Sequence, residues 1–412
     1  MAHHSHHDAG AAALEDRAYV VPKSVQNLAL ALIAVGVAGL GFAFAGEAWR
    51  GWSNVLIGGY YFTGIALGAS FIFAVFSMVN AGWWVVIKRP VEAFTTFLPV
   101  GLVAFLAIGL LGLHDLYEWS VPEIVQHDML LQRKAPLLNE AGWLMRVVIY
   151  FGIWMTTTYL MRRHSRAQDN GPVDERTKSN VRLGAIHLVL FALTVTFSGL
   201  DWMSSLEPHW FSTMFGVYQF IGMFVAATAW LTLFVLGMKK AGYLPYVNEN
   251  HYHDLGKMMF GFATFWAYIW VSQYMLIWYS NIPEETSYYF NRQHHGWEYI
   301  WALNPIVRWV APFLILLPRG NKRNPKILAL AAGILVFGHW LDIYLQVMPA
   351  TSHFAAHHHG ADVHGPLFGL QEVGGLAFFA GLFLLIVPKM MERAPLLAKH
   401  DPYLEEALHH DQ

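Results

Sequence analysis

Ten stretches of apolar residues, each about as long as a bilayer-crossing helix, constrain this chain more than any other feature. The hydrocarbon core of a membrane is about 30 Å thick, so a helix needs roughly 20 apolar residues to span it. Backbone polar groups in lipid must be paired within the protein, and an apolar stretch of this length achieves that as a helix. The sequence therefore predicts an all-α polytopic membrane protein with about ten transmembrane helices. They are expected at residues 25–44, 56–79, 94–113, 141–161, 183–202, 213–236, 258–279, 300–317, 327–347 and 374–387.

The composition agrees with burial in lipid and excludes several functions. Hydrophobic residues make up 56% of the 412 residues and charged residues only 13%, about half the share found in soluble domains. The net charge of −2 gives no basis for nucleic-acid binding. The chain has no Cys, which excludes thiolate-ligated iron–sulfur clusters and disulfides within it. The polar, His-rich residues 1–23 lack the apolar core of a secretory signal, so we expect a solvated tail.

Basic residues predict the orientation. If the ten stretches cross in alternation, 20 of the 26 Lys and Arg lie on one side, in the two tails and the loops of that side. Two more, Arg146 and Arg308, lie inside spans, and the opposite side holds only Arg50, Arg133, Lys134 and Arg292. Because Lys and Arg are enriched in cytoplasmic loops, we expect a multi-pass protein with both termini in the cytoplasm.

Spans two to five resemble spans six to nine. Arg146 in the fourth span matches Arg308 in the eighth, and Asp201 in the fifth matches Asp342 in the ninth, in the same order. Each unit has an even number of helices, so the copies would run parallel, related by an axis along the membrane normal. We therefore expect two parallel-repeat four-helix bundles with two peripheral helices. The expected segments are a cytoplasmic tail (1–24), a first peripheral span and loop (25–53), the two bundles (54–211 and 212–348), an outer His-rich loop (349–373), and a last span with a cytoplasmic tail (374–412).

Ionisable residues inside the spans are costly in hydrocarbon and are expected to face protein or water. The repeat predicts one Arg–Asp pair per bundle, Arg146 with Asp201 and Arg308 with Asp342. Both a structural ion pair and a proton route fit this pattern. The full set, gathered near the outer side, is His114, Asp115, Arg146, Asp201, Arg308, His339 and Asp342.

One face of the fifth span is polar along nearly its whole length. His187, Thr194, Ser198 and Asp201 follow one another at spacings of seven, four and three residues, which place them on one side of a helix. Hydrogen bonding between helices explains Thr194 and Ser198 but not His187 and Asp201 together. A His, two hydroxyls and a carboxylate in a row are what a water-assisted proton path requires, so we favour that interpretation.

The sequence gives little support for a metal site or a haem site. No span carries the paired His residues that hold b-haem. The His-rich outer segment, with His353, His357, His358, His359 and His364, is more typical of a solvated loop. We expect no metal in this chain and no cofactor bound covalently or through Cys.

The stretch from Asp201 to Thr213, DWMSSLEPHWFST, closely resembles a segment of a known family. It is similar to the NrfD/PsrC-like membrane subunits of bacterial alternative complex III, a quinol:cytochrome c oxidoreductase, and the chain length is most like the shorter, ActF-type subunit. The resemblance implies a bacterial cytoplasmic (inner) membrane subunit whose complex oxidises menaquinol or a related quinol. It implies as partners a paralogous NrfD-like membrane subunit, an iron–sulfur subunit, c-type cytochrome subunits and membrane lipid, with haem and iron–sulfur clusters in those partner subunits.

We therefore expect a respiratory membrane subunit that contributes a proton path and a quinone-facing surface. The four polar residues of the fifth span would line one half of the path, with Arg146 and Arg308 tuning the acids. Polar chambers nearer the outside would be lined by His114, Asp115, His339 and Asp342. Two alternatives stay open. One is direct quinol oxidation at His114 or Asp115, and the other is a stand-alone secondary transporter, for which Pro305 and Pro312 hint at a broken helix.

Overall fold

The computed structural model describes residues 18–171, 174–358, 360–361 and 365–411. Over these residues the chain is all-α and forms no strand. Nine helical segments within them are long and apolar enough to cross a membrane. Seven of them each contain one long helix: α2 (Lys23–Gly46), α3 (Ala48–Met78), α9 (Glu140–Ala167), α10 (Asp174–Trp202), α11 (Phe215–Lys240), α17 (Pro325–His358) and α18 (Leu370–Met391). The other two are the composite segments Trp83–Leu116, which contains α4 to α6, and Trp297–Leu316, which contains α14 and α15.

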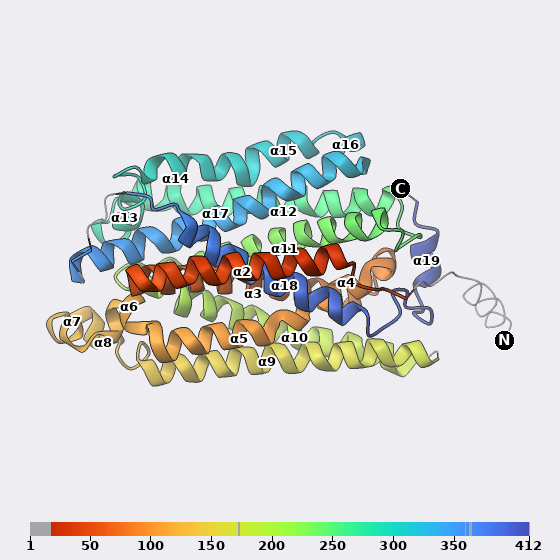
Figure 1. Ribbon diagram of the computed structural model, residues 1–412, viewed down its shortest axis with the longest axis horizontal. Helices are drawn as coiled ribbons and strands as arrows, with labels where there is room; N and C mark the ends of the chain where they lie inside the picture. Colours follow the sequence, from red (N-terminus) through yellow and green to blue (C-terminus); the bar gives the residue numbers. More distant parts are fainter. Residues whose placement is uncertain (1–17, 172–173, 359, 362–364, 412) are drawn as a thin grey trace.

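A further long helix, α12 (Glu249–Ser280), lies among these segments in Figure 1 and packs against α11. It has no continuous stretch as apolar as those of the nine, because Trp and Tyr residues and Gln273 interrupt its apolar residues. Each of the ten stretches predicted from the sequence is therefore helical, and nine of them also meet the length and hydropathy of a membrane span.

The long helices run side by side along the longest axis, so the molecule has two ends (Figure 1). We call the end with α4 (Lys88–Phe94), α16 (Arg319–Arg323) and α19 (Leu404–Leu408) the terminal face. The opposite end, the far face, carries α6 (Leu113–Leu116), α7 (Pro122–His127), α8 (Met129–Lys134) and α13 (Pro283–Phe290).

Helices α3 and α11 pack against each other at the centre of the molecule. On one side α3 packs against α5 (Leu98–Ala107) and α10, and α10 packs against α9. On the other side α11 packs against α12 and α17, and α17 packs against α15 (Ala311–Leu316). Helices α2 and α18 form a tight pair alongside α3. A Cβ on Gly39 of α2 would lie 2.7 Å from the Cα of Gly374 of α18, so only small residues permit this contact.

Several boundaries differ from those predicted by hydropathy. The third span begins at Trp83 rather than near residue 94, so Lys88 and Arg89 belong to it. Helix α17 continues through Pro349 to His358, so the first part of the expected outer loop at 349–373 is helical. Two π-helical turns, Ile108–Gly112 and Ile306–Val310, interrupt otherwise continuous helical segments. The second follows Pro305 directly, because proline cannot donate the ordinary α-helical hydrogen bond.

Candidate functional site

Both Arg–Asp pairs predicted from the repeat form, and the first is fully hydrogen-bonded. Arg146 on α9 binds Asp201 on α10 through two bonds, with Nε 2.7 Å from Oδ2 and Nη2 3.0 Å from Oδ1. Tyr150 donates a further bond of 2.7 Å to Oδ2, and the third Arg146 nitrogen donates to the carbonyl of Leu137. Paired and hydrogen-bonded in this way, a buried charge loses little of the stabilisation it has in water.

The second pair has a looser geometry. Arg308 lies in the π turn at Ile306–Val310, is 1% exposed, and has its Nη2 3.8 Å from Oδ2 of Asp342. None of the three guanidinium nitrogens has a hydrogen-bond partner among the described residues. The guanidinium instead lies over the ring of Trp266, 4.6 Å from its centroid. Asp342 accepts hydrogen bonds from Tyr218 and Asn304. Asp342 therefore compensates the charge of Arg308, but the N–H groups of Arg308 have no hydrogen-bond acceptor among the described residues.

His339 lies one turn before Asp342 on α17 and is 2% exposed. Neither of its ring nitrogens has a hydrogen-bond partner among the described residues. Gly222 of α11 makes room for both side chains, since a Cβ there would lie 3.1 Å from Cε1 of His339 and 3.2 Å from Nη2 of Arg308. We call Arg308, His339 and Asp342 the α17 cluster. Buried donors without partners are rare in proteins and usually mark water, a ligand or a functional site.

A small cavity borders the α17 cluster on the far-face side. It encloses about 310 Å³ between atoms, of which about 20 Å³ is available to the centre of a water molecule. That volume suits about one water and is too small for a quinone ring. Polar groups lining it include Tyr218, Gln273, Arg292, Asn304, Asp342 and Gln346.

The polar residues of α10 are buried as predicted, but each is bonded to a neighbouring helix or to its own turn. The ring nitrogens of His187 lie 2.7 Å from Oγ1 of Thr157 and 3.1 Å from Oγ of Ser70. Thr194 accepts a 2.7 Å bond from Trp154, and Ser198 donates to a carbonyl one turn back. Among the described residues no hydrogen bond joins one member of this stripe to the next. A proton path along α10 therefore requires water between them.

The sequence missed a polar link from α10 to the α17 cluster. Gly199 of α10 faces Gln219 of α11, whose Cγ would lie 3.2 Å from a Cβ at that position. The amide of Gln219 donates to the side chain of Gln346 on α17, which lines the cavity beside Asp342. Tyr60 of α3 lies at the same place with a buried hydroxyl that has no partner among the described residues. Charge and hydropathy do not distinguish these neutral Gln and Tyr side chains from others in the sequence, so their contacts could not be predicted.

His114 and Asp115 do not form a buried chamber. The His114 side chain is 62% exposed, and its Nε2 lies 3.5 Å from a carboxylate oxygen of Glu140. Asp115 is half-buried at the end of α6. Of the four residues expected to line outer chambers, only His339 and Asp342 are buried.

Glu207 and His209 of the DWMSSLEPHWFST stretch tie segments of the chain together at the far face, and Glu207 joins the two halves of the molecule. His209 lies 2.6 Å from Asp128, before α8, whereas Glu207 forms a 2.7 Å ion pair with Arg292, after α13. Burial alone would lower the pKa of Arg292, but the Glu207 carboxylate raises it above its usual value. Burial likewise tends to raise the pKa of Asp128, but hydrogen bonds from Leu131 N–H and from His209 bring it below its usual value. Both residues belong to the stretch that carries the resemblance, and their contacts hold separate segments of the chain together.

Replacing Glu207 with glutamine is expected to lower the free energy of unfolding by about 2 kcal/mol, because Arg292 is 2% exposed and would lose its only carboxylate partner among the described residues. Thermal unfolding of the purified protein in detergent measures the change. Asn291→Ala is the matched control, since it removes only a 3.3 Å hydrogen bond to the same carboxylate and should cost about 1 kcal/mol or less. Equal losses for the two variants would contradict the assignment.

A second group of buried ionisable residues lies near the terminal face, where the sequence placed only His187. Arg89 of α4 forms ion pairs with Glu92, at 2.8 Å, and with Asp169. Ser165 of α9 donates to the Glu92 carboxylate. Hydropathy began this span near residue 94, so Arg89 and Glu92 were read as loop residues. The buried ionisable residues are therefore not confined to one side of the membrane-spanning region.

Among the described residues, no group of three or more His, Asp or Glu side chains is arranged to hold a metal ion. His353 and His357 lie with their Nε2 atoms 3.2 Å apart, whereas His359 and His364 fall outside the described residues. No protein-family model matches the chain, and no curated protein matches it significantly in sequence. The function must therefore be argued from the residues themselves.

Proposed function

We propose that this chain is a membrane-embedded subunit of a quinol-oxidising respiratory complex and that it conducts protons through its helices. The loop charges favour a cytoplasmic location for its termini, and the resemblance of the DWMSSLEPHWFST stretch suggests the kind of complex. The partners it suggests are a paralogous NrfD-like subunit, an iron–sulfur subunit and c-type cytochromes. The two groups of four helices around α3 and α11 fit an internal duplication, with α2 and α18 as the flanking pair.

The α17 cluster is the observation that carries the proposal. A purely structural ion pair gains most when every donor is satisfied, as in the Arg146–Asp201 pair. Arg308 and His339 are more deeply buried than Arg146, yet their side-chain nitrogens have no hydrogen-bond partner among the described residues. Groups of this kind within membrane-spanning helices are expensive, and proteins use them where ions or protons pass. We therefore assign the proton-exchanging role to Asp342 and His339 and a structural role to Asp201.

The proposed route runs along α10 and then crosses to α17. His187 and Thr194 lie on the α10 face that packs against α3 and α9, and Gly199 brings this face against Gln219. Gln219 and Gln346 then lead to the cavity beside Asp342. Side-chain amides and hydroxyls can relay protons only when water completes the chain, and the cavity has room for about one water molecule.

Purification of the chain in mild detergent tests its membership of a redox complex. We expect it to carry with it the visible absorbance of c-type haem together with iron from iron–sulfur clusters, although this chain has no Cys to bind either. Variants in the α17 cluster should keep this association. A chain that purifies without haem and iron from a membrane that contains them would instead favour the stand-alone transporter.

A second candidate function, quinone binding by this chain, is favoured by a groove at the far ends of α2 and α3. About 340 Å³ of the groove is available to the centre of a water molecule, and the groove is lined by Phe42, Glu47, Arg50, Leu367 and Gln371. This size falls within the range of small-molecule sites. A photoreactive quinone analogue in native membranes should label residues 42–50 if they bind quinone. Labelling confined to other subunits would exclude quinone binding here.

A further inference from the structure

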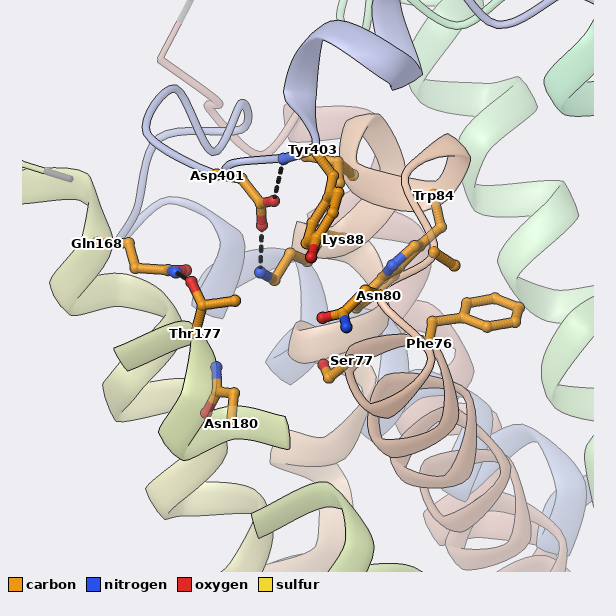
Figure 2. Close-up of a pocket in the computed structure, with 12 residues that line it drawn as sticks. Phe76, Ser77, Asn80, Trp84, Lys88, Gln168, Thr177, Asn180, Asp401 and Tyr403 are labelled. Atoms are coloured by element: carbon orange, nitrogen blue, oxygen red, sulfur yellow. Dashed lines mark hydrogen bonds and ion pairs between the residues drawn. The ribbon is translucent and has the colours of Figure 1, made fainter. Parts of the chain in front are cut away.

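A polar pocket at the terminal face lies between α3, α10 and the C-terminal segment. In Figure 2, Gln168, Thr177 and Asn180 form one wall, and Ser77 and Asn80 form the opposite wall. Lys88 reaches in between them, and residues of the C-terminal segment lie across the top. The pocket encloses about 330 Å³ between atoms, of which about 20 Å³ is available to the centre of a water molecule.

Two buried side-chain oxygens in this wall lack partners. Gln168 is 3% exposed and Asn180 is 4% exposed. The Gln168 amide nitrogen donates a 2.6 Å bond to Thr177, but its Oε1 has no hydrogen-bond partner among the described residues, and neither does Oδ1 of Asn180. Buried carbonyl oxygens of this kind are usually satisfied by ordered water. The pocket is thus polar enough, and just large enough, to be hydrated.

The pocket lies on the same helix–helix seam as the first residue of the proposed route. Asn180 and His187 lie seven residues apart on α10, and Ser77 and Ser70 lie seven residues apart on the antiparallel α3, so the two pairs follow one seam. At the middle of the seam a Cβ on Gly184 would lie 2.9 Å from the carbonyl oxygen of Ala74. At its inner end His187 meets Ser70 at 3.1 Å. The seam therefore places the pocket two helical turns from His187, with closely packed backbone between them.

The C-terminal segment, residues 395–411, closes the pocket on its outer side. Asp401 forms a 2.7 Å ion pair with Lys88, and both side chains are less than one-tenth exposed. Beyond it, α19 packs on Trp83–Ile87, and Nε2 of His410 lies 2.5 Å from a carboxylate oxygen of Asp254 on α12. The segment is thus fixed at its end by α12, along its length by the buried side chains of Leu396, Leu397 and Leu404, and over the pocket by one buried ion pair.

We infer that this pocket is the water entrance of the proton path and that the C-terminal segment is its lid, held closed by the Lys88–Asp401 ion pair. With the lid closed the pocket admits about one water molecule. Breaking the ion pair leaves a buried charge without its partner and favours lifting of the segment. What passes through the entrance rests on the proposed function, whereas the lid itself can be tested without it.

Thiol labelling provides that test, because the chain contains no Cys. Asn180→Cys, in the complex in native membrane vesicles, is exposed to a charged methanethiosulfonate, and the mass of this chain is followed with time. Slow labelling is expected with the lid latched. Adding Asp401→Asn should accelerate it at least about tenfold, the factor given by a change of about 1.4 kcal/mol in the opening equilibrium. Ser77→Cys on the opposite wall is a second reporter should Asn180→Cys fail to assemble.

Two controls separate lid opening from general loosening. Lys389→Gln removes an exposed charge near the same face and should leave the labelling rate of Asn180→Cys unchanged. Thr228→Cys, fully buried on α11, should stay unlabelled even with Asp401→Asn. Labelling that does not respond to Asp401→Asn, or that also reaches Thr228→Cys, would overturn the inference. Labelling requires no proton movement. The lid can therefore be confirmed even if the proposed function is wrong, and it can be rejected even if the proposed function is right.

Discussion

Replacing Arg308 with methionine and Asp342 with leucine together is expected to stop proton movement through the chain while leaving it folded. Proton release in membrane vesicles, measured with a pH-sensitive dye during quinol oxidation, should fall to the passive leak. The double variant replaces a buried ion pair that has few hydrogen bonds by apolar groups of similar size. Replacing a whole buried ion pair is neutral or stabilises by about 1–4 kcal/mol. This gain offsets the cost, about 1–3 kcal/mol for each group, of leaving Tyr218 and Asn304 without their carboxylate acceptor, so thermal unfolding should occur at about the same temperature.

The single variants show whether the two residues act as a pair. Asp342→Leu alone leaves the buried Arg308 guanidinium without its carboxylate, and we expect it to cost about 3–5 kcal/mol, which Arg308→Met then recovers. Undiminished proton release by the folded double variant would remove the α17 cluster from the path. A large loss of stability in the double variant would show that the pair is structural after all.

Asp201→Asn is expected to have the opposite profile, with a loss of about 3 kcal/mol in the free energy of unfolding and little change in proton release per electron. Asparagine cannot accept the two charged bonds of Arg146 together with the bond of Tyr150, so the packing of α9 on α10 loses a complete network. The measurement is thermal unfolding in detergent, combined with the same vesicle assay on the fraction that assembles.

Tyr150→Phe serves as the matched control for Asp201→Asn. It removes one hydrogen bond from the same carboxylate and should cost about 1 kcal/mol without affecting the ion pair. If the assembled Asp201→Asn protein moves no protons, then Asp201 belongs to the path and the division of roles between the two Arg–Asp pairs is wrong.

The Arg–Asp pairing could be predicted from the sequence because it depends only on the order of matching residues in two similar units. The sequence could not show that one pair is fully hydrogen-bonded and the other is not. It depends on a π turn after Pro305, which carries Arg308, and on the contact of Gly222 with the α17 cluster. Neither feature has a hydropathy or charge signal. Helix positions were likewise predictable within a few residues, since long apolar runs leave a chain in lipid few alternatives to a helix.

The residues near the terminal face were missed for a related reason. Hydropathy locates the apolar middle of a helix and ignores its polar ends, so Lys88, Arg89 and Glu92 were treated as loop residues. Their partners, Asp169 and Asp401, come from distant parts of the chain. Pairing of this kind depends on tertiary structure. The hydropathy of successive segments carries no information about which distant residues pair.

The pairing of α2 with α18 has a consequence for how the protein is made. The ribosome delivers α2 first among these helices and α18 last, yet each supplies glycines to the other. A Cβ on Gly36 would overlap the backbone of Phe378, and one on Gly381 would lie 2.7 Å from the carbonyl of Ala29. During synthesis the small-residue face of α2 therefore remains unpaired in the bilayer until α18 is inserted. Chains that stop before residue 370 would keep this face exposed to lipid and to the quality-control proteases of the membrane.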